Sequence, residues 1–120
     1  MWADLSKPWR TAVREAWTAY CAGSIAIGAA ITDAEGRVIA RGRNCMGEAS
    51  APGYGLAGSR MAHAEMNALL DLARQGIDPH ACTLYTTTEP CPMCTGAIRM
   101  FHVGRVCYAS RDPVAGSAAF

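Results

Sequence analysis

The chain has 120 residues, of which 51% are hydrophobic and 18% are charged. This composition excludes an intrinsically disordered protein, and the length predicts one domain, residues 1–120, that buries its own core without disulfide bonds. The 11 Lys and Arg residues nearly balance the 10 Asp and Glu residues, so the formal net charge is +1. No polybasic tail therefore points to nucleic acid or anionic lipid as a partner.

The N-terminal segment lacks the features of a targeting signal. Charged residues interrupt the first twenty positions, and the least polar run, 21–32, is too short to span a bilayer. The sequence contains six cysteines. Without a secretion signal, these cysteines indicate a reduced, cytoplasmic protein with no membrane partner.

The first half of the chain predicts a helix and a β-hairpin. Apolar residues recur at helical spacing over 9–20, after Pro8. The apolar run 21–32 reads as a strand, and the polar segment 33–36 ends in glycine, which is typical of a tight turn. A second strand over 37–41 completes an antiparallel hairpin.

The second half alternates helices with strands. A loop over 44–62, rich in Gly, Ala, Ser and Pro, precedes a predicted helix over 63–75. A strand over 82–88, a helix over 92–100 and a short strand over 105–109 follow. A hairpin followed by alternating helices and strands predicts the α/β class, as a three-layer α/β/α sandwich around one mixed sheet.

Two sulfurs and one imidazole form the candidate metal site. Cys91 and Cys94 lie three residues apart at a predicted helix start, where unpaired N–H groups and the helix dipole favour thiolates. His63 at a second helix start supplies a third ligand. Three protein ligands leave one tetrahedral position open, which is the arrangement of catalytic zinc.

Glu65 stands two residues after His63 and suits proton transfer rather than ligation. Zinc lowers the pKa of its bound water to roughly 7, so a neighbouring carboxylate accepts that proton at neutral pH. The same carboxyl group then returns protons to a substrate nitrogen and a departing amine. His63 and Cys91 are separated by enough chain for a helix, a turn and a strand, so both helix starts lie at one sheet edge.

Two other interpretations of these residues remain open. A strand, then C-P-x-C, then a helix is also the setting of a thioredoxin-like thiol redox motif. A purely structural zinc site is the second alternative. It needs a fourth ligand and leaves Glu65 without a role. The candidates for that fourth ligand are Cys45, Cys82, Cys107, His80 and His102.

The motifs H-A-E at residues 63–65 and P-C-P-M-C at 90–94 resemble the signature of the zinc-dependent cytidine deaminase-like superfamily. The run 84–98 is similar to the branch that contains cytosine deaminases, guanine deaminases and tRNA adenosine deaminases. Segments 104–106 and 110–112 most resemble the tRNA adenosine deaminases. The resemblance spans roughly residues 9–116.

This resemblance implies zinc-dependent hydrolytic deamination of an amino-substituted nucleobase, with release of ammonia. The base is free, in a nucleoside, or within a polynucleotide such as tRNA or single-stranded DNA. One zinc ion per chain is implied, held by His63, Cys91 and Cys94, with Glu65 as the proton shuttle. The implied substrate-binding groups are the Asn44 side chain, the Ala64 backbone N–H and Asp112 at the pocket rim.

The sequence departs from the family pattern in three places. The link between Asn44 and His63 is longer than expected, and residues 22–24 replace acidic and hydrophobic positions before the first strand. The chain stops eight residues after Asp112, where relatives continue with a helix and often a strand, so we expect a shortened C-terminal part. A near-neutral charge favours a small substrate, and the family analogy favours a homodimer.

Overall fold

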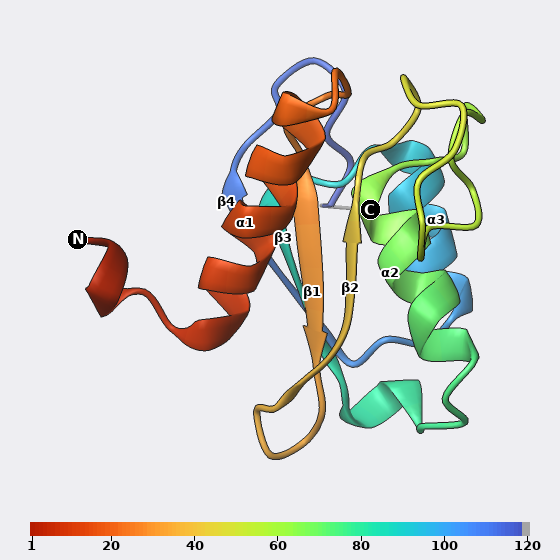
Figure 1. The fold of residues 1–120 in the computed structure, drawn as a ribbon. Coiled ribbons are helices and arrows are strands. Elements are labelled where there is room, and N and C mark those ends of the chain that lie inside the picture. The colour runs from red at the N-terminus through yellow and green to blue at the C-terminus, as the bar shows by residue number, and fades with distance from the viewer. Residues whose placement is uncertain (119–120) are drawn as a thin grey trace.

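The computed structural model describes residues 1–118, which form a mixed four-stranded sheet in the order β2-β1-β3-β4. Helix α1 covers one face and helices α2 and α3 cover the other (Figure 1), which confirms the predicted three-layer sandwich. Within the described residues, no helix is both long and apolar enough to cross a membrane. The elements are α1 (Lys7–Cys21), β1 (Gly28–Thr32), β2 (Val38–Arg43), α2 (Ala64–Ala73), β3 (Thr83–Thr88), α3 (Pro92–Met100) and β4 (Arg105–Ser110), with short 3-10 turns at Trp2–Asp4 and Pro79–Ala81.

Helix α1 is longer than predicted, and the predicted strand over 21–32 is wrong in its first part. The helix runs through Cys21, and β1 begins only at Gly28. Gly23 adopts a positive φ of 84°, and the next amide, that of Ser24, bonds back to the Ala19 carbonyl. A left-handed glycine closes helices in this way, so the apolar run splits into a helix end, a turn and a strand.

The predicted hairpin is confirmed. Strands β1 and β2 pair antiparallel, with Gly28 opposite Arg43 at one end and Thr32 opposite Val38 at the other. The turn depends on Asp33, whose carboxylate accepts hydrogen bonds from the backbone amides at positions 35 and 37. An Asx turn of this kind closes the hairpin through local contacts alone.

Strand β3 joins the hairpin to the second half of the fold. It pairs antiparallel with β1 and parallel with β4, and α3 forms the crossover between the two parallel strands. The main core lies between the sheet and the helices α2 and α3. Its largest buried members are Ile31, Leu69, Leu72, Leu84 and Ile98. The starts of α2 and α3 meet at the edge of the sheet where β3 ends.

Glycine at position 42 lets α2 lie directly on β2. A Cβ atom at Gly42 would overlap the carbonyl oxygen of Ala64 and the amide nitrogen of Ala68. Because α2 begins at Ala64, this contact also sets the position of the helix start that follows His63. A residue without a side chain is thus needed at position 42 for α2 to pack against β2 near His63.

We predict that Gly42→Ala lowers the free energy of unfolding by about 1–3 kcal/mol, because helix and strand must move apart. Urea denaturation measures the loss. Gly96→Ala is the matched control. Gly96 lies inside α3, and a Cβ atom added there would have no neighbouring atom within 4 Å. Alanine in that helix should leave stability unchanged or raise it by up to about 1 kcal/mol. Equal losses in both variants would contradict the packing argument.

Candidate metal centre

The structure brings His63, Cys91 and Cys94 together. The His63 Nδ1 atom lies 3.6 Å from the Cys91 sulfur and 3.5 Å from the Cys94 sulfur. The three potential ligand atoms all lie within 4.8 Å of one another. Tetrahedral zinc with ordinary Zn–N and Zn–S bonds places its N and S ligands about 3.6 Å apart. The observed separations therefore fit one zinc ion.

Two helix starts bring these ligands together. His63 is the N-cap of α2, Cys91 is the N-cap of α3, and Cys94 lies in the first turn of α3. The amide of Cys45 bonds to the carbonyl of Ala62 and holds the chain just before His63. A proline at position 92 begins α3, where its missing N–H costs nothing.

The chemistry of the donor set favours a bound cation. Burial raises the pKa of the Cys94 thiol, and the neighbouring carboxylate of Glu65 and the Cys91 sulfur raise it further. Two sulfurs and a carboxylate crowded in a buried space repel one another when ionised. A divalent cation with an affinity for nitrogen and sulfur removes that repulsion, and zinc has this preference.

The proposed fourth ligands of a purely structural site do not join the three. Among the described residues, His63, Cys91 and Cys94 are the one group with metal-binding geometry. The Cys45 sulfur accepts a hydrogen bond from Asn67 instead. His80 and His102 stack on each other, with ring centroids 5.4 Å apart. Within residues 1–118 the cluster thus offers three potential protein ligands, which is the number that catalytic zinc sites use.

Glu65 lies near the Cys94 sulfur and is almost completely buried. It sits in the first turn of α2, and its Oε1 atom accepts a 2.6 Å hydrogen bond from the Thr86 hydroxyl. Sequence reasoning missed Thr86. Its signal was weak, because Thr86 is one of several threonines along β3 and nothing local shows which of them faces the site.

Asn44 and Ala64 border the same edge of the sheet. Buried Asn44 directly follows β2, and its Oδ1 atom accepts a hydrogen bond from the amide of Met46. The side chain therefore caps the turn after its strand, while its Nδ2 group donates no hydrogen bond within residues 1–118. Ala64 is the first residue of α2, where backbone N–H groups lack a partner inside the helix.

Asp112 follows β4 in a segment that folds back toward the start of α3. Its Oδ1 atom accepts hydrogen bonds from the amides of Val114 and Ala115, and its own amide donates to the carboxylate of Glu89. Ser117 then bonds to the carbonyl of Pro90. Asp112 thus shapes a turn next to the residues that precede Cys91.

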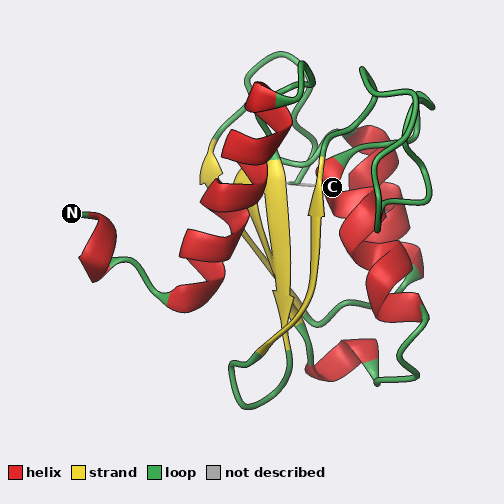
Figure 2. Cartoon of the chain, in the orientation of Figure 1, coloured by secondary structure: helices red, strands yellow, loops and turns green. Residues whose placement is uncertain are grey.

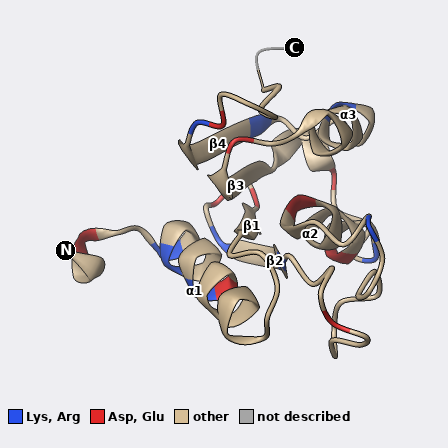
Figure 3. Cartoon of the chain, turned by 90° about the horizontal axis from the view of Figure 1, so that it is seen from above, with Lys and Arg blue, Asp and Glu red and all other residues tan. Residues whose placement is uncertain are grey.

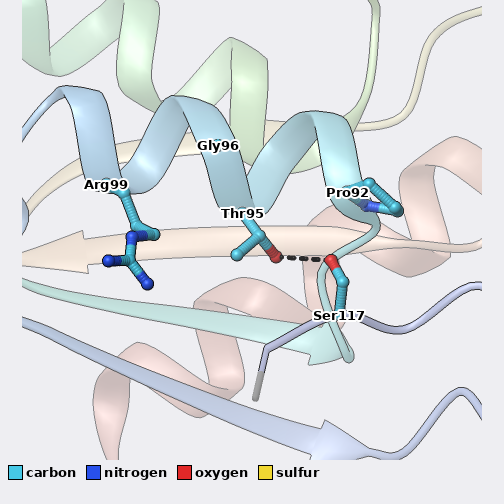
Figure 4. A pocket seen from close by; sticks show the side chains of 5 residues that line it. All are labelled: Pro92, Thr95, Gly96, Arg99 and Ser117. Carbon is cyan, nitrogen blue, oxygen red and sulfur yellow. Dashed lines mark hydrogen bonds between the residues drawn. The ribbon is translucent and has the colours of Figure 1, made fainter. Parts of the chain in front are cut away.

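A cavity of about 480 Å³ lies on the outer side of α3 (Figure 4). The hydroxyls of Thr95 and Ser117 form a 3.0 Å hydrogen bond at its wall. Cys94 is buried on the inner side of the same helix. The cavity is therefore separate from the metal centre. Its lining residues are Pro92, Thr95, Gly96, Arg99 and Ser117.

The long loop between β2 and α2 (Figure 2) confirms the irregular structure expected for 44–62. Two polar contacts tie it to the body of the protein. Arg43 pairs with Glu48 at 2.8 Å, and the Tyr54 hydroxyl donates a 2.6 Å hydrogen bond to the buried carboxylate of Glu15 on α1. Burial and the Glu15 carboxylate raise the pKa of Tyr54, which keeps its phenol a donor.

An α/β sandwich that brings one nitrogen and two sulfur donors together beside a buried carboxylate is the arrangement typical of zinc-dependent deaminases. Residues 3–110 match the family described as the cytidine and deoxycytidylate deaminase zinc-binding region. The chain belongs to this family.

Relatives with known structures or activities agree with this assignment. A cytosine deaminase of Candida albicans is 35% identical over 104 residues, which cover 86% of this chain and 64% of that protein. A structure from a study of tRNA:A34 deaminases superimposes with a TM-score of 0.78 at 32% identity, covering 92% of this chain and 80% of that one. A guanine deaminase of Bacillus subtilis has a TM-score of 0.73 at 31% identity, covering 89% and 66%. The chain thus spans less than two thirds of the length of the Candida albicans cytosine deaminase.

We predict that Cys94→Ser lowers both zinc content and melting temperature, because serine is a poor zinc ligand and metal binding is coupled to folding. Zinc per chain, measured by atomic emission after dialysis, should fall well below the wild-type value. Cys21→Ser is the matched control, since Cys21 is exposed and free at the end of α1. Unchanged zinc in Cys94→Ser would remove this residue from the centre.

Proposed function

We propose that this chain is a zinc-dependent deaminase domain that hydrolyses the amino group of a nucleobase and releases ammonia. The observation that carries the proposal is the open triad of His63, Cys91 and Cys94 with the Glu65 carboxylate beside it. We assign the three ligand positions to the triad, with one zinc ion per chain. Residues 1–120 would then form a single catalytic domain.

The chain's own residues provide binding and proton transfer. A zinc ion held by the triad would supply Lewis-acid activation of water. Glu65 accepts one proton from the attacking water and delivers it to the ring nitrogen of the base. The water oxygen bonds to the ring carbon that carries the amine. Glu65 then takes the remaining proton of that oxygen and passes it to the amine nitrogen, the C–N bond breaks, and ammonia departs.

We assign base recognition to groups at the same sheet edge. The unpartnered Nδ2 group of Asn44 can donate to a ring acceptor, and the Ala64 N–H can donate to an exocyclic oxygen or ring nitrogen. The Asp112 Oδ2 atom, which has no partner within the described residues, is assigned to the pocket rim.

A free base or nucleoside is the proposed substrate. Positively and negatively charged residues lie interspersed along the helices and loops of the ribbon (Figure 3), and the formal net charge is only +1. Polynucleotide binding usually depends on neutralising several phosphates with Lys and Arg. A base within tRNA or single-stranded DNA is the alternative, favoured by the likeness to tRNA:A34 deaminases. Ammonia release from cytosine, guanine and adenine as bases, nucleosides and oligonucleotides distinguishes these substrates.

The proposal also includes a homodimer and a cytoplasmic location. The side chains of Val13, Trp17 and Tyr20 form an exposed apolar face on α1, a surface that self-association would cover. Sedimentation velocity tests the dimer. The cysteines at all six positions are free, which agrees with a reducing compartment.

We predict that Glu65→Gln retains one zinc per chain and lowers kcat for ammonia release by about 10²- to 10⁴-fold, because glutamine cannot carry the proton. Initial rates with the best substrate of the panel, normalised to bound zinc, provide the measurement. Glu35→Gln, a change of an exposed carboxylate in the hairpin turn, is the control. Near-normal turnover in Glu65→Gln would refute the proton-shuttle assignment.

We predict that Asn44→Ala raises KM or lowers kcat/KM by about 10-fold or more, because one buried hydrogen bond to the substrate is lost. Zinc content should stay unchanged, since Asn44 contacts no ligand of the triad in the described hydrogen bonds. Asn44→Ala also removes the turn contact with Met46, so Asn44→Asp serves as the comparison that keeps the Oδ1 acceptor. If Asn44→Asp matches wild-type kcat/KM, the base-binding assignment fails.

A further inference from the structure

We propose that Thr86 is a positioning residue that orients the Glu65 carboxylate for proton transfer. This inference rests on the function proposed above, because it assigns the proton shuttle to Glu65. It is carried by the short hydrogen bond between the Thr86 hydroxyl and Glu65 Oε1, at 2.6 Å between two side chains with almost no solvent exposure.

This bond is short for a hydroxyl donor. Its length lies at the strong end of the range for O–H···O hydrogen bonds, which is about 2.5–3.0 Å. The Thr86 hydroxyl has a second acceptor, the carbonyl of Thr88, at 3.2 Å. One hydroxyl proton cannot serve both acceptors fully, and the shorter contact to Glu65 dominates.

The donor is held rigidly. Strand β3 is an inner strand, and Thr86 pairs with Ala29 of β1 on one side and Tyr108 of β4 on the other. Its side chain is completely buried, and a β-branched residue has few χ1 choices. The position of the hydroxyl oxygen is therefore set by the sheet rather than by a mobile loop.

Anchoring one carboxylate oxygen determines where the other one lies. Glu65 has three side-chain torsions, and without an anchor its carboxylate would sample several rotamers. With Oε1 bonded to Thr86, only Oε2 remains for the proton work at the metal centre. A displacement of about 1 Å in a reacting group is enough to lower a rate by about 100-fold.

Two other threonine hydroxyls of β3 do not share this role. The Thr87 oxygen accepts a 3.2 Å hydrogen bond from the Gly28 amide, a contact within the sheet. Thr83, at the far end of the strand, makes no side-chain hydrogen bond within the described residues. Thr83→Val therefore offers a matched control for the same chemical change in the same strand.

The experiment compares Thr86→Val, Thr86→Ser and Thr83→Val in the full zinc-loaded chain. We measure kcat and KM for ammonia release per bound zinc, together with zinc content and melting temperature. Thr86→Val should lower kcat by about 10- to 100-fold with KM within threefold of wild type. Thr86→Ser, which keeps the hydroxyl, should restore kcat to within about threefold, and Thr83→Val should match wild type.

Each outcome decides the inference. Thr86→Val with kcat within twofold of wild type overturns it, and so does an equal loss of kcat in Thr86→Ser, which would indicate packing by the methyl group. An equal loss in Thr83→Val would indicate a general sensitivity of β3. A wild-type chain that releases no ammonia while holding zinc rejects the proposed function itself, whereas active wild type with unaffected Thr86→Val rejects only the positioning role.

Discussion

The site depends on two helices that begin at the same edge of one sheet. Their first turns supply an imidazole and two sulfurs to a single point, with nitrogen-to-sulfur separations of 3.5 and 3.6 Å. Helix starts suit this task because their free N–H groups and dipoles stabilise thiolates and developing negative charge. Placing both starts together requires the parallel pairing of β3 with β4 and the crossover through α3.

The buried carboxylate of Glu65 disfavours an ionised sulfur at the neighbouring ligand position. Glu65 is almost completely buried, and its presence raises the pKa of the Cys94 thiol. A cation held by His63, Cys91 and Cys94 would offset this repulsion. The hydroxyl of Thr86 adds a fixed donor to the Glu65 carboxylate. This group of side chains thus suits a bound cation.

Small residues and a few buried polar contacts hold the remaining structure around this edge. Gly42 allows α2 to lie against β2, and Gly28 allows the same close approach of α1 to β1. The long loop before His63 is not free, since Tyr54 bonds to Glu15 and Arg43 pairs with Glu48. The chain leading into the metal centre is therefore anchored to both the opposite helix layer and the hairpin.

Local patterns in the sequence predicted most of the elements and the candidate ligands of the metal centre. Helical spacing, the turn at Asp33 and the H-A-E and P-C-P-M-C motifs are short-range features, because each depends on residues within one or two turns of the chain. The same reasoning failed at 21–27, where an apolar run concealed a glycine helix end. Only the tertiary structure decided that Thr86 rather than another threonine reaches Glu65, and that Tyr54 meets Glu15 across 39 positions. These contacts depend on strand register and on packing between layers, which neighbouring residues do not encode.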